Sequence, residues 1–352
     1  MEKILDAHVH CSLALTAREL DDFLNTTGTA KACLLACAHS RCLSLVPRAM
    51  ESKLLFPGKY YVFGAPDASA YFLRGGDIGQ AQKEYCAGLM AMGCDGIKLL
   101  EGKPQVRKLY PIPDFDLPVW EPFWQWAEEE QVPILWHVND PANFWDTENA
   151  PVFAKSCGWV YDESYINNEV QYAQVIRVLE RHPKLSVCFA HFFFMSGSLE
   201  RLSDILDRYE GVCIDLTPGI EMYEDFSADT EKTRAFFGKY QDRIFYGTDI
   251  GGRCVLEGEN KPFDPLENTR RPRIVRRFLS ESGSELIESD SHYLIGRAPF
   301  TMNCLGLSEE ILAKIYAENF ESFAGAQPRA ADADALEGYK TELKKKLDEM
   351  AL

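Results

Sequence analysis

The chain has 352 residues, of which 46% are hydrophobic and 26% are charged, a composition typical of a globular protein rather than a disordered one. Lys and Arg number 37 against 54 Asp and Glu, which gives a net charge of −17 at pH 7. A surface this acidic repels phosphate backbones and anionic lipid headgroups, so nucleic-acid-binding and membrane-surface functions are disfavoured. No apolar run approaches the roughly 20 residues that span a bilayer.

The 11 cysteines favour a reducing compartment. Cys33, Cys37, Cys188 and Cys213 lie inside apolar runs, as small buried side chains do. The count is odd, and the N-terminus lacks the apolar segment of a signal peptide. The Cys33-x-x-x-Cys37 spacing, with Cys42 following, has no second pair at the spacing of a structural zinc site. We therefore expect free thiols and a cytoplasmic protein.

Short apolar runs predict eight buried strands, each hydrophobic almost throughout, as in a parallel sheet that is covered on both faces. The runs span residues 4–10, 32–38, 60–65, 96–100, 133–138, 185–191, 212–216 and 244–249. Helices are expected between them at residues 16–24, 45–55, 78–92, 121–130, 168–182, 198–209 and 229–240.

This alternation predicts an α/β fold, since eight strands with intervening helices over about 250 residues are typical of a (β/α)8 TIM barrel. The alternative is a doubly wound open sheet, which usually carries a Gly-rich phosphate loop after its first strand. Here the first strand ends in His-Val-His-Cys-Ser, without glycine, so the barrel is favoured.

We expect one barrel domain over residues 1–325, followed at 326–352 by a linker and a C-terminal amphipathic helix. The barrel carries an aromatic loop insertion at 139–167, which includes Trp145 and Trp159. A long aromatic loop after a barrel strand is expected to form a lid or a wall of the substrate site. The alternative is a packed surface loop without a role in binding.

Histidines gather at the expected carboxyl ends of the strands, where barrel enzymes place their active sites. His8 and His10 end the first strand and point to the same side, because side chains alternate along a strand. His137 ends the fifth strand, His191 the sixth, and Asp249 the eighth. Imidazoles with one carboxylate are the donors that catalytic zinc prefers, so the pattern predicts a metal site.

Several stretches together resemble a known family. They are Asp6-Ala-His-Val-His10, Gly96-Ile-Lys-Leu-Leu100, Trp136-His137, Ala190-His191-Phe192, Tyr246-Gly-Thr-Asp249 and, as a closing helix, Ile311-Leu-Ala-Lys-Ile-Tyr-Ala-Glu-Asn319-Phe320. The set resembles the amidohydrolase-related family, or amidohydrolase family 2, in the branch that includes aminocarboxymuconate-semialdehyde decarboxylase. The resemblance covers roughly residues 4–325 and implies a TIM barrel of the metal-dependent hydrolase type.

The resemblance implies one divalent metal ion held by His8, His10, His137 and Asp249, with His191 as a nearby acid–base group. Zinc is the expected metal, and manganese is the alternative. Asp249 is expected to act in catalysis as well as in ligation. The family also often forms dimers, so a homodimer is an open expectation.

Two departures from the family pattern alter the expected pocket wall. Phe192-Phe193-Phe194 follow the sixth-strand histidine, where the family often has glycines. Ile250-Gly251-Gly252-Arg253 follow the last aspartate, where the family often has a proline.

The expected substrate contacts are Lys98, Trp145, Trp159 and Arg253. Three roles are open for Lys98 on the fourth strand: a contact with a substrate carboxylate, a structural ion pair, or the carboxylated lysine that bridges two metals in binuclear superfamily members. Arg253 could pair with an anionic substrate or form an exposed salt bridge. The two tryptophans suit the wall of a mostly apolar site.

The leading functional hypothesis is a metal-dependent hydrolase of a small carbonyl-containing compound, which could also carry a carboxylate. The first alternative is a metal-dependent non-oxidative decarboxylase of an aromatic or enoic acid, because the resemblance implies the same residues for both reactions. The second alternative is a non-catalytic barrel that binds a ligand. The expected partner is a small molecule, not nucleic acid or a membrane.

Overall fold

The computed structural model describes residues 3–39, 42–219, 221–251, 263–288 and 299–350. Its centre is a parallel sheet in which neighbouring strands follow the order β10-β9-β8-β7-β6-β5-β2-β1-β11. The strands are β1 Leu5–His10, β2 Lys31–Ala36, β5 Tyr60–Gly64, β6 Gly96–Gly102, β7 Ile134–Val138, β8 Val187–Phe189, β9 Val212–Asp215, β10 Ile244–Phe245 and β11 Ile250–Gly251.

The two end strands of this order, β10 and β11, belong to one stretch of chain, residues 244–251, of which 244–249 are expected as a single strand. The Ala7 amide donates to the carbonyl of Tyr246 at 2.9 Å. The Asp249 amide donates to the carbonyl of His8, also at 2.9 Å. Strand β1 is thus bonded to the residues between β10 and β11, and the sheet closes on itself. With that stretch counted as one interrupted strand, the protein is the expected (β/α)8 barrel.

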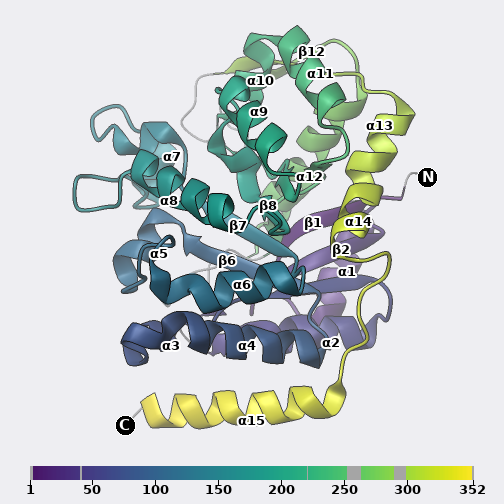
Figure 1. Cartoon of the computed structure of the whole chain (residues 1–352). Helices are drawn as coiled ribbons and strands as arrows, with labels where there is room; N and C mark the ends of the chain where they lie inside the picture. Colours follow the sequence, from purple (N-terminus) through teal and green to yellow (C-terminus); the bar gives the residue numbers. More distant parts are fainter. Residues whose placement is uncertain (1–2, 40–41, 220, 252–262, 289–298, 351–352) are drawn as a thin grey trace.

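Helices surround the sheet, as Figure 1 shows. They are α1 Ala17–Thr26, α2 Val46–Leu55, α3 Ala70–Leu73, α4 Ile78–Met92, α5 Pro104–Leu109, α6 Glu121–Glu129, α7 Val152–Ser156, α8 Asn168–Arg181, α9 Leu199–Arg208, α10 Met222–Ala228, α11 Thr230–Lys239, α12 Pro265–Ser280, α13 Glu309–Ala313, α14 Asn319–Ala324 and α15 Ala333–Met350. Single 3₁₀ turns are η1 Gly75–Asp77, η2 Pro118–Trp120 and η3 Ala142–Trp145, and a π-helical turn, Lys314–Glu318, joins α13 to α14. The described residues also form two antiparallel strand pairs: β3 Ala38–His39 with β4 Leu43–Ser44, and β12 Ser284–Ile287 with β13 Phe300–Asn303.

A small hydrophobic cluster fills the inside of the barrel, and a larger one packs the strands against the helices. The inner cluster takes alternate residues of successive strands, such as Leu5 and Ala7 of β1, and it includes Phe320 of α14. Asn319 fixes α14 there by donating to the carbonyls of Gln241 and Ile244 at 2.7 and 2.9 Å. The amino ends of the strands are therefore closed by apolar side chains, which leaves the carboxyl ends for polar groups.

Helix α15 occupies the C-terminal tail and runs along α2, α3 and α4 in Figure 1. Leu336 and Leu343 of this helix are buried. The hydroxyls of Tyr339 and Tyr85 lie 2.5 Å apart, so the tail is joined to α4 by a polar contact as well as by apolar packing.

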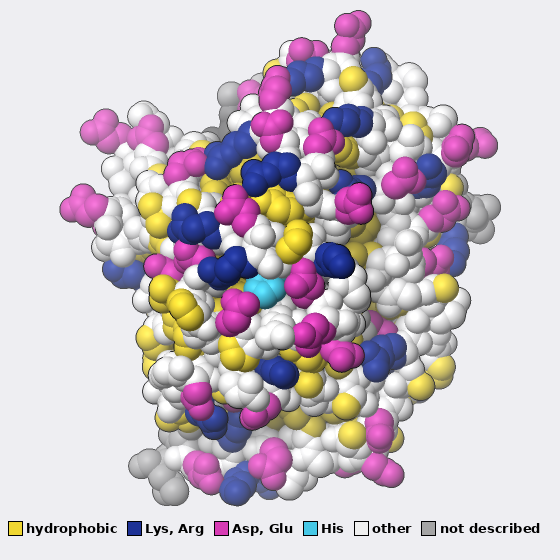
Figure 2. Space-filling view, in the orientation of Figure 1, with side chains coloured by type: hydrophobic (Ala, Val, Ile, Leu, Met, Phe, Trp, Pro, Cys, Tyr) yellow, Lys and Arg dark blue, Asp and Glu magenta, His cyan; other side chains and the backbone are white. Residues whose placement is uncertain are grey.

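Charged side chains of both signs cover the surface. Figure 2 shows acidic side chains spread over one face, with Lys and Arg among them. Some form ion pairs, such as Arg201 with Glu169 at 2.8 Å and Lys239 with Asp207 at 2.7 Å. Exposed pairs of this kind contribute about 0–1 kcal/mol each, so the apolar interior supplies most of the stability. In the described part of the chain, no helix has both the length and the apolar character needed to cross a membrane.

Glu101 near the end of β6 is a buried carboxyl group, with 6% of its surface exposed. Burial raises its pKa to about 7 from an ordinary value of 4.5. The folded state therefore binds a proton that the unfolded state releases, so this group's contribution to stability falls as the pH rises from about 4.5 through 7.

We expect Glu101→Gln to stabilise the protein at pH 8 by about 1–3 kcal/mol relative to the unmodified chain, and to have little effect at pH 4.5. Urea denaturation at the two pH values measures the free energy of unfolding. Glu130→Gln, at an exposed position, is the control. It should not change the difference between the free energies of unfolding measured at the two pH values. An equal effect of Glu101→Gln at both pH values would contradict the prediction.

Candidate metal centre

His8 and His10 lie at the carboxyl end of β1, and both point into the barrel. A β-bulge between Asp6 and Val9 shifts the register of β1 against β2, and Val9 packs in the outer hydrophobic cluster. The two Nε2 atoms lie 3.3 Å apart. Asp249 Oδ1 lies 3.0 Å from His10 Nε2 and 3.6 Å from His8 Nε2. One donor atom from each of the three residues falls within 4.8 Å of the others, which is close enough for a single ion to contact all three.

Asp249 reaches this position because the eighth strand is interrupted before it. Its φ angle is +57°, in the left-handed region, which turns the chain between β10 and β11. Arg271 of α12 donates through Nη1 to Asp249 Oδ2 at 2.6 Å and to its carbonyl at 2.9 Å. Burial opposes the charged form, but Arg271 and His10 hold the pKa of Asp249 well below its usual range. Asp249 is therefore a carboxylate at neutral pH, with one oxygen facing the two histidines.

His191 stands in a left-handed turn that follows β8. The strand ends at Phe189, two residues earlier than expected, and residues 191–194 have φ angles of 51–58°. Aromatic packing holds this turn, since the rings of Phe189 and Phe193 stack at 3.9 Å and the imidazole of His191 stacks on Phe194 at 5.0 Å. The His191 ring lies 5.5 Å from that of His8. Burial, with His137 nearby, holds the pKa of His191 well below its ordinary value, so the imidazole is neutral near pH 7.

His137 at the end of β7 belongs to the same group of rings but not to the tight cluster of three donors. Its ring lies 4.9 Å from that of His191. Burial lowers its pKa to about 4, so this imidazole is neutral as well. Its Nε2 lies 3.4 Å from Asp140 Oδ1, but the two atoms are not aligned for a hydrogen bond.

The donor set fits a divalent metal. His137 Nε2 and His191 Nδ1 are buried nitrogens that have no hydrogen-bond partner in the described part of the chain. Such atoms are costly to bury unless something binds them. Burial opposes the charged form of His10, but its hydrogen bond to Asp249 raises the pKa of this imidazole to about 9. Zinc takes neutral imidazoles beside an ionised carboxylate in catalytic sites, so a metal bound here would displace the proton of His10. The assignment of His137 and His191 as ligand and acid–base group, respectively, stays a prediction.

Lys98 of β6 lies deeper in the barrel, where it pairs in register with Leu135 of the inner cluster. Its side chain is fully buried, and its Nζ has no hydrogen-bond partner among the described residues. The structural ion pair weighed for this residue is therefore not found there. Burial lowers the pKa of Lys98, and the charges of Asp215 and Asp249 partly oppose that effect.

Asp140, at the start of the aromatic loop insertion, connects this loop to His137 and to Lys103. Lys103 Nζ lies 4.2 Å from the centre of the Trp159 ring and 2.7 Å from both carboxylate oxygens of Asp140. Tyr161 donates to Asp140, and its ring lies 4.8 Å from that of Trp145. Both tryptophans are thus linked to Asp140, the neighbour of His137, while their role as a pocket wall stays a prediction. Arg253 lies outside the described residues.

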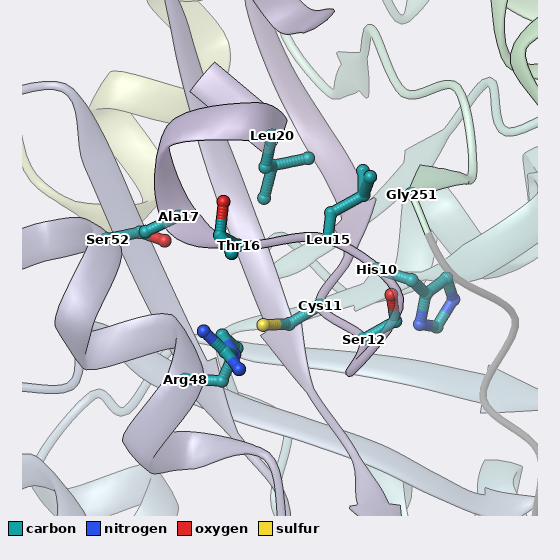
Figure 3. A pocket seen from close by; sticks show the side chains of 10 residues that line it. All are labelled: His10, Cys11, Ser12, Leu15, Thr16, Ala17, Leu20, Arg48, Ser52 and Gly251. Carbon is teal, nitrogen blue, oxygen red and sulfur yellow. The ribbon is translucent and has the colours of Figure 1, made fainter. Parts of the chain in front are cut away.

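A small pocket adjoins the centre on the outer side of β1. It is lined by His10, Cys11, Ser12, Leu15, Thr16, Ala17, Leu20, Arg48, Ser52 and Gly251. Figure 3 shows Cys11 and Arg48 pointing toward each other, whereas the imidazole of His10 turns to the opposite side of the loop. The pocket therefore shares a backbone wall with the centre, but it is not the space that the three donor atoms face.

Two residues of the centre were missed by sequence analysis. Asp215 ends β9 and contacts both His8 and His191, and its position at the end of an apolar run was the available signal. Arg271 belongs to α12, a helix that sequence analysis did not predict, and no local pattern placed it beside Asp249.

Solved structures share the fold of this protein, and a family model identifies its family. A sequence model described as amidohydrolase matches residues 79–320. No curated protein matches the chain. An uncharacterised TIM-barrel protein from Bordetella bronchiseptica is 12% identical, with a TM-score of 0.57 over 91% of this chain and 98% of that one.

Two further solved structures are of proteins with named activities. One is 5-carboxyvanillate decarboxylase from Sphingomonas paucimobilis, with 10% identity and a TM-score of 0.53. The other is a probable 2-pyrone-4,6-dicarboxylic acid hydrolase from Acinetobacter baumannii with citric acid bound, with 11% identity and a TM-score of 0.51. Each alignment covers 92% of this chain and 99% of the other. At these identities the likeness shows the fold alone. The family match spans more than half of the chain, and it follows that this protein belongs to the amidohydrolase family.

Proposed function

We propose that the protein is a metal-dependent hydrolase of a small carbonyl compound that carries a carboxylate. The observation that supports this most directly is the group formed by His8, His10 and Asp249, with the unpartnered Nδ1 of His191 beside it. A divalent ion bound there, zinc or manganese, would polarise a carbonyl and lower the pKa of a water toward ~7.

His191 is the residue to which we assign proton transfer. It is neutral and buried, and its ring lies beside the ring of His8, so it can take a proton from an attacking water and return it to the leaving group. Asp249 is less suited to this task, because Arg271 occupies Oδ2 and lowers its basicity. We assign Asp249 first to metal ligation, through Oδ1.

Lys98 supplies the argument for a carboxylated substrate. A buried ammonium without a partner is costly, and a substrate carboxylate would satisfy it. Trp145 and Trp159 are assigned to the wall beside the substrate, and Arg253 to a contact with its anionic group.

The buried Nζ of Lys98 without a hydrogen-bond partner among the described residues also favours a second candidate function. Lys98 could also bind the carboxylate of an aromatic or enoic acid that is decarboxylated, with His191 protonating the carbon that loses carbon dioxide. The two proposals differ in the bond that breaks: an acyl bond cleaved by water in one, and the bond to the carboxylate carbon in the other. We propose for both a cytoplasmic enzyme that could function as a homodimer.

The test is an assay of the zinc- or manganese-loaded protein on lactones, esters and amides, each with and without a carboxylate, and on aromatic and enoic acids. Formation of the hydrolysis product without carbon dioxide supports the hydrolase, whereas carbon dioxide release supports the decarboxylase. No bound metal in the purified protein and no measurable zinc or manganese affinity would instead favour a barrel that only binds a ligand.

Lys98→Met is expected to lower kcat/KM for carboxylated substrates by roughly 10–100-fold, the contribution of a hydrogen bond to a charged group. For substrates without the carboxylate, kcat/KM should fall little, and the metal content of the protein should not change. An equal loss for both kinds of substrate would contradict the contact with a carboxylate.

A further inference from the structure

Asp215 is a fully buried carboxylate at the end of β9, which pairs with β8, the strand that precedes His191, and with β10. Its Oδ2 lies 2.7 Å from His8 Nδ1. Its Oδ1 accepts the backbone N–H of His191 at 2.8 Å and that of Thr217 at 3.1 Å. The hydroxyl of Thr217 also donates to Oδ1, and its oxygen, which can accept a second hydrogen bond, lies 3.0 Å from His8 Nδ1. The two carboxylate oxygens of Asp215 therefore contact different histidines: Oδ2 contacts the ring of His8, and Oδ1 accepts from the backbone of His191.

The contact with His8 selects which ring nitrogen carries the proton. An ionised carboxylate accepts hydrogen bonds only, so Nδ1 of His8 must be the protonated nitrogen. The lone pair then resides on Nε2, the atom that faces His10 Nε2 and Asp249 Oδ1. A carboxylate in this position fixes both the tautomer and the direction of a metal-binding imidazole.

The contact with His191 holds its backbone rather than its ring. His191 is the first of the residues with a positive φ angle after β8, and no glycine is present to make that conformation easy. The hydrogen bond from its N–H to Asp215 anchors the start of the turn, and the direction of the imidazole follows from the backbone that carries it.

We propose that Asp215 is a positioning residue that sets both the metal affinity of the centre, through His8, and the placement of His191. The proposal rests on the proposed function only in taking His8 as a metal ligand. The selection of the His8 tautomer needs no metal and can be tested without it.

The test compares Asp215→Asn with the unmodified chain. The amide keeps the size of the side chain, but an NH2 group that replaces Oδ2 cannot accept from Nδ1–H, so His8 should change to the tautomer that is protonated on Nε2. We expect nitrogen-15 NMR of the metal-free protein to show this change. We also expect the zinc Kd to rise by roughly 10–100-fold, the usual cost of removing an outer carboxylate from a ligating histidine. With saturating zinc, kcat should still be below that of the unmodified protein, whereas KM should change little.

Asp225→Asn is the matched control. Asp225 is a half-buried carboxylate outside the group of three donor atoms, and it accepts a hydrogen bond from Ser196 at 2.7 Å. Its replacement should leave the His8 tautomer and the zinc Kd unchanged. If Asp215→Asn fails to fold, Thr217→Val removes the hydroxyl that donates to Asp215 and lies 3.0 Å from His8 Nδ1. It therefore weakens the same cluster around Nδ1 and should raise the zinc Kd by roughly 2–10-fold, the contribution of one hydrogen bond.

An unchanged His8 tautomer together with an unchanged zinc Kd, in Asp215→Asn or failing that in Thr217→Val, would overturn the proposal. Failure of the proposed function gives a different result, because an unmodified protein that binds no zinc would still show the dependence of the His8 tautomer on Asp215.

Discussion

His191→Asn is expected to lower turnover by roughly two to four orders of magnitude, the usual contribution of general acid–base catalysis. The imidazole is neutral near pH 7, its Nδ1 has no partner among the described residues, and its ring lies 5.5 Å from that of His8. Asn keeps a polar side chain of similar size but cannot exchange a proton near pH 7. His191 lies outside the group of three donor atoms, so bound zinc should remain near-stoichiometric and the fold intact.

The control is His182→Asn. His182 follows α8 and pairs with Glu121 at 3.2 Å and with Glu128 at 3.3 Å, away from the centre. This variant should retain both turnover and metal. Loss of zinc from His191→Asn would make His191 a ligand, and would restore the binuclear alternative in which Lys98 is carboxylated.

Removing both proposed metal ligands of β1 is expected to abolish metal retention. His8→Ala combined with His10→Ala leaves only Asp249 of the three clustered donors, together with the more distant His137. The barrel should still fold, because its interior is formed by the separate apolar cluster. Metal analysis after gel filtration measures the loss, and circular dichroism measures the fold.

The Tm of this variant gives a second, thermodynamic measure of metal binding. A metal present at 1,000 times its Kd stabilises the folded state by about 4 kcal/mol, so a chelator should lower the Tm of the unmodified protein and leave that of the double variant unchanged. Full zinc occupancy in the double variant would refute the assignment of His8 and His10.

The sequence predicted the parts of the centre that depend on local pattern. Apolar runs located the strands, and the residue types at their carboxyl ends located His8, His10 and Asp249, which the structure brings together. These predictions succeed because parallel barrel strands carry their carboxyl ends to the same face.

The parts that were missed depend on contacts between distant segments. Asp215 and Arg271 act on residues far away in sequence, and nothing near them in the chain indicates those partners. The left-handed turn at His191 was also missed, because a run of three phenylalanines lacks the glycine that usually marks such a conformation. Packing of Phe192 against Phe226 and Phe237, with ring centres 4.8 and 6.0 Å apart, offsets that unfavourable backbone, and packing of this kind cannot be read from local propensity.

The interrupted eighth strand has a consequence for the order in which the protein folds. Thr248 and Asp6, on the two sides of the closing seam, are bonded although 242 residues separate them. Contacts this distant form late, because the entropy of closing so long a loop must be overcome before they contribute. A newly made chain that contains His8 and His10 therefore cannot bind a metal at the complete proposed site until the last strand pairs with β1 and places Asp249 beside them. Metal capture would then occur after barrel closure, and release of the ion should accompany opening of this seam rather than loss of the outer helices.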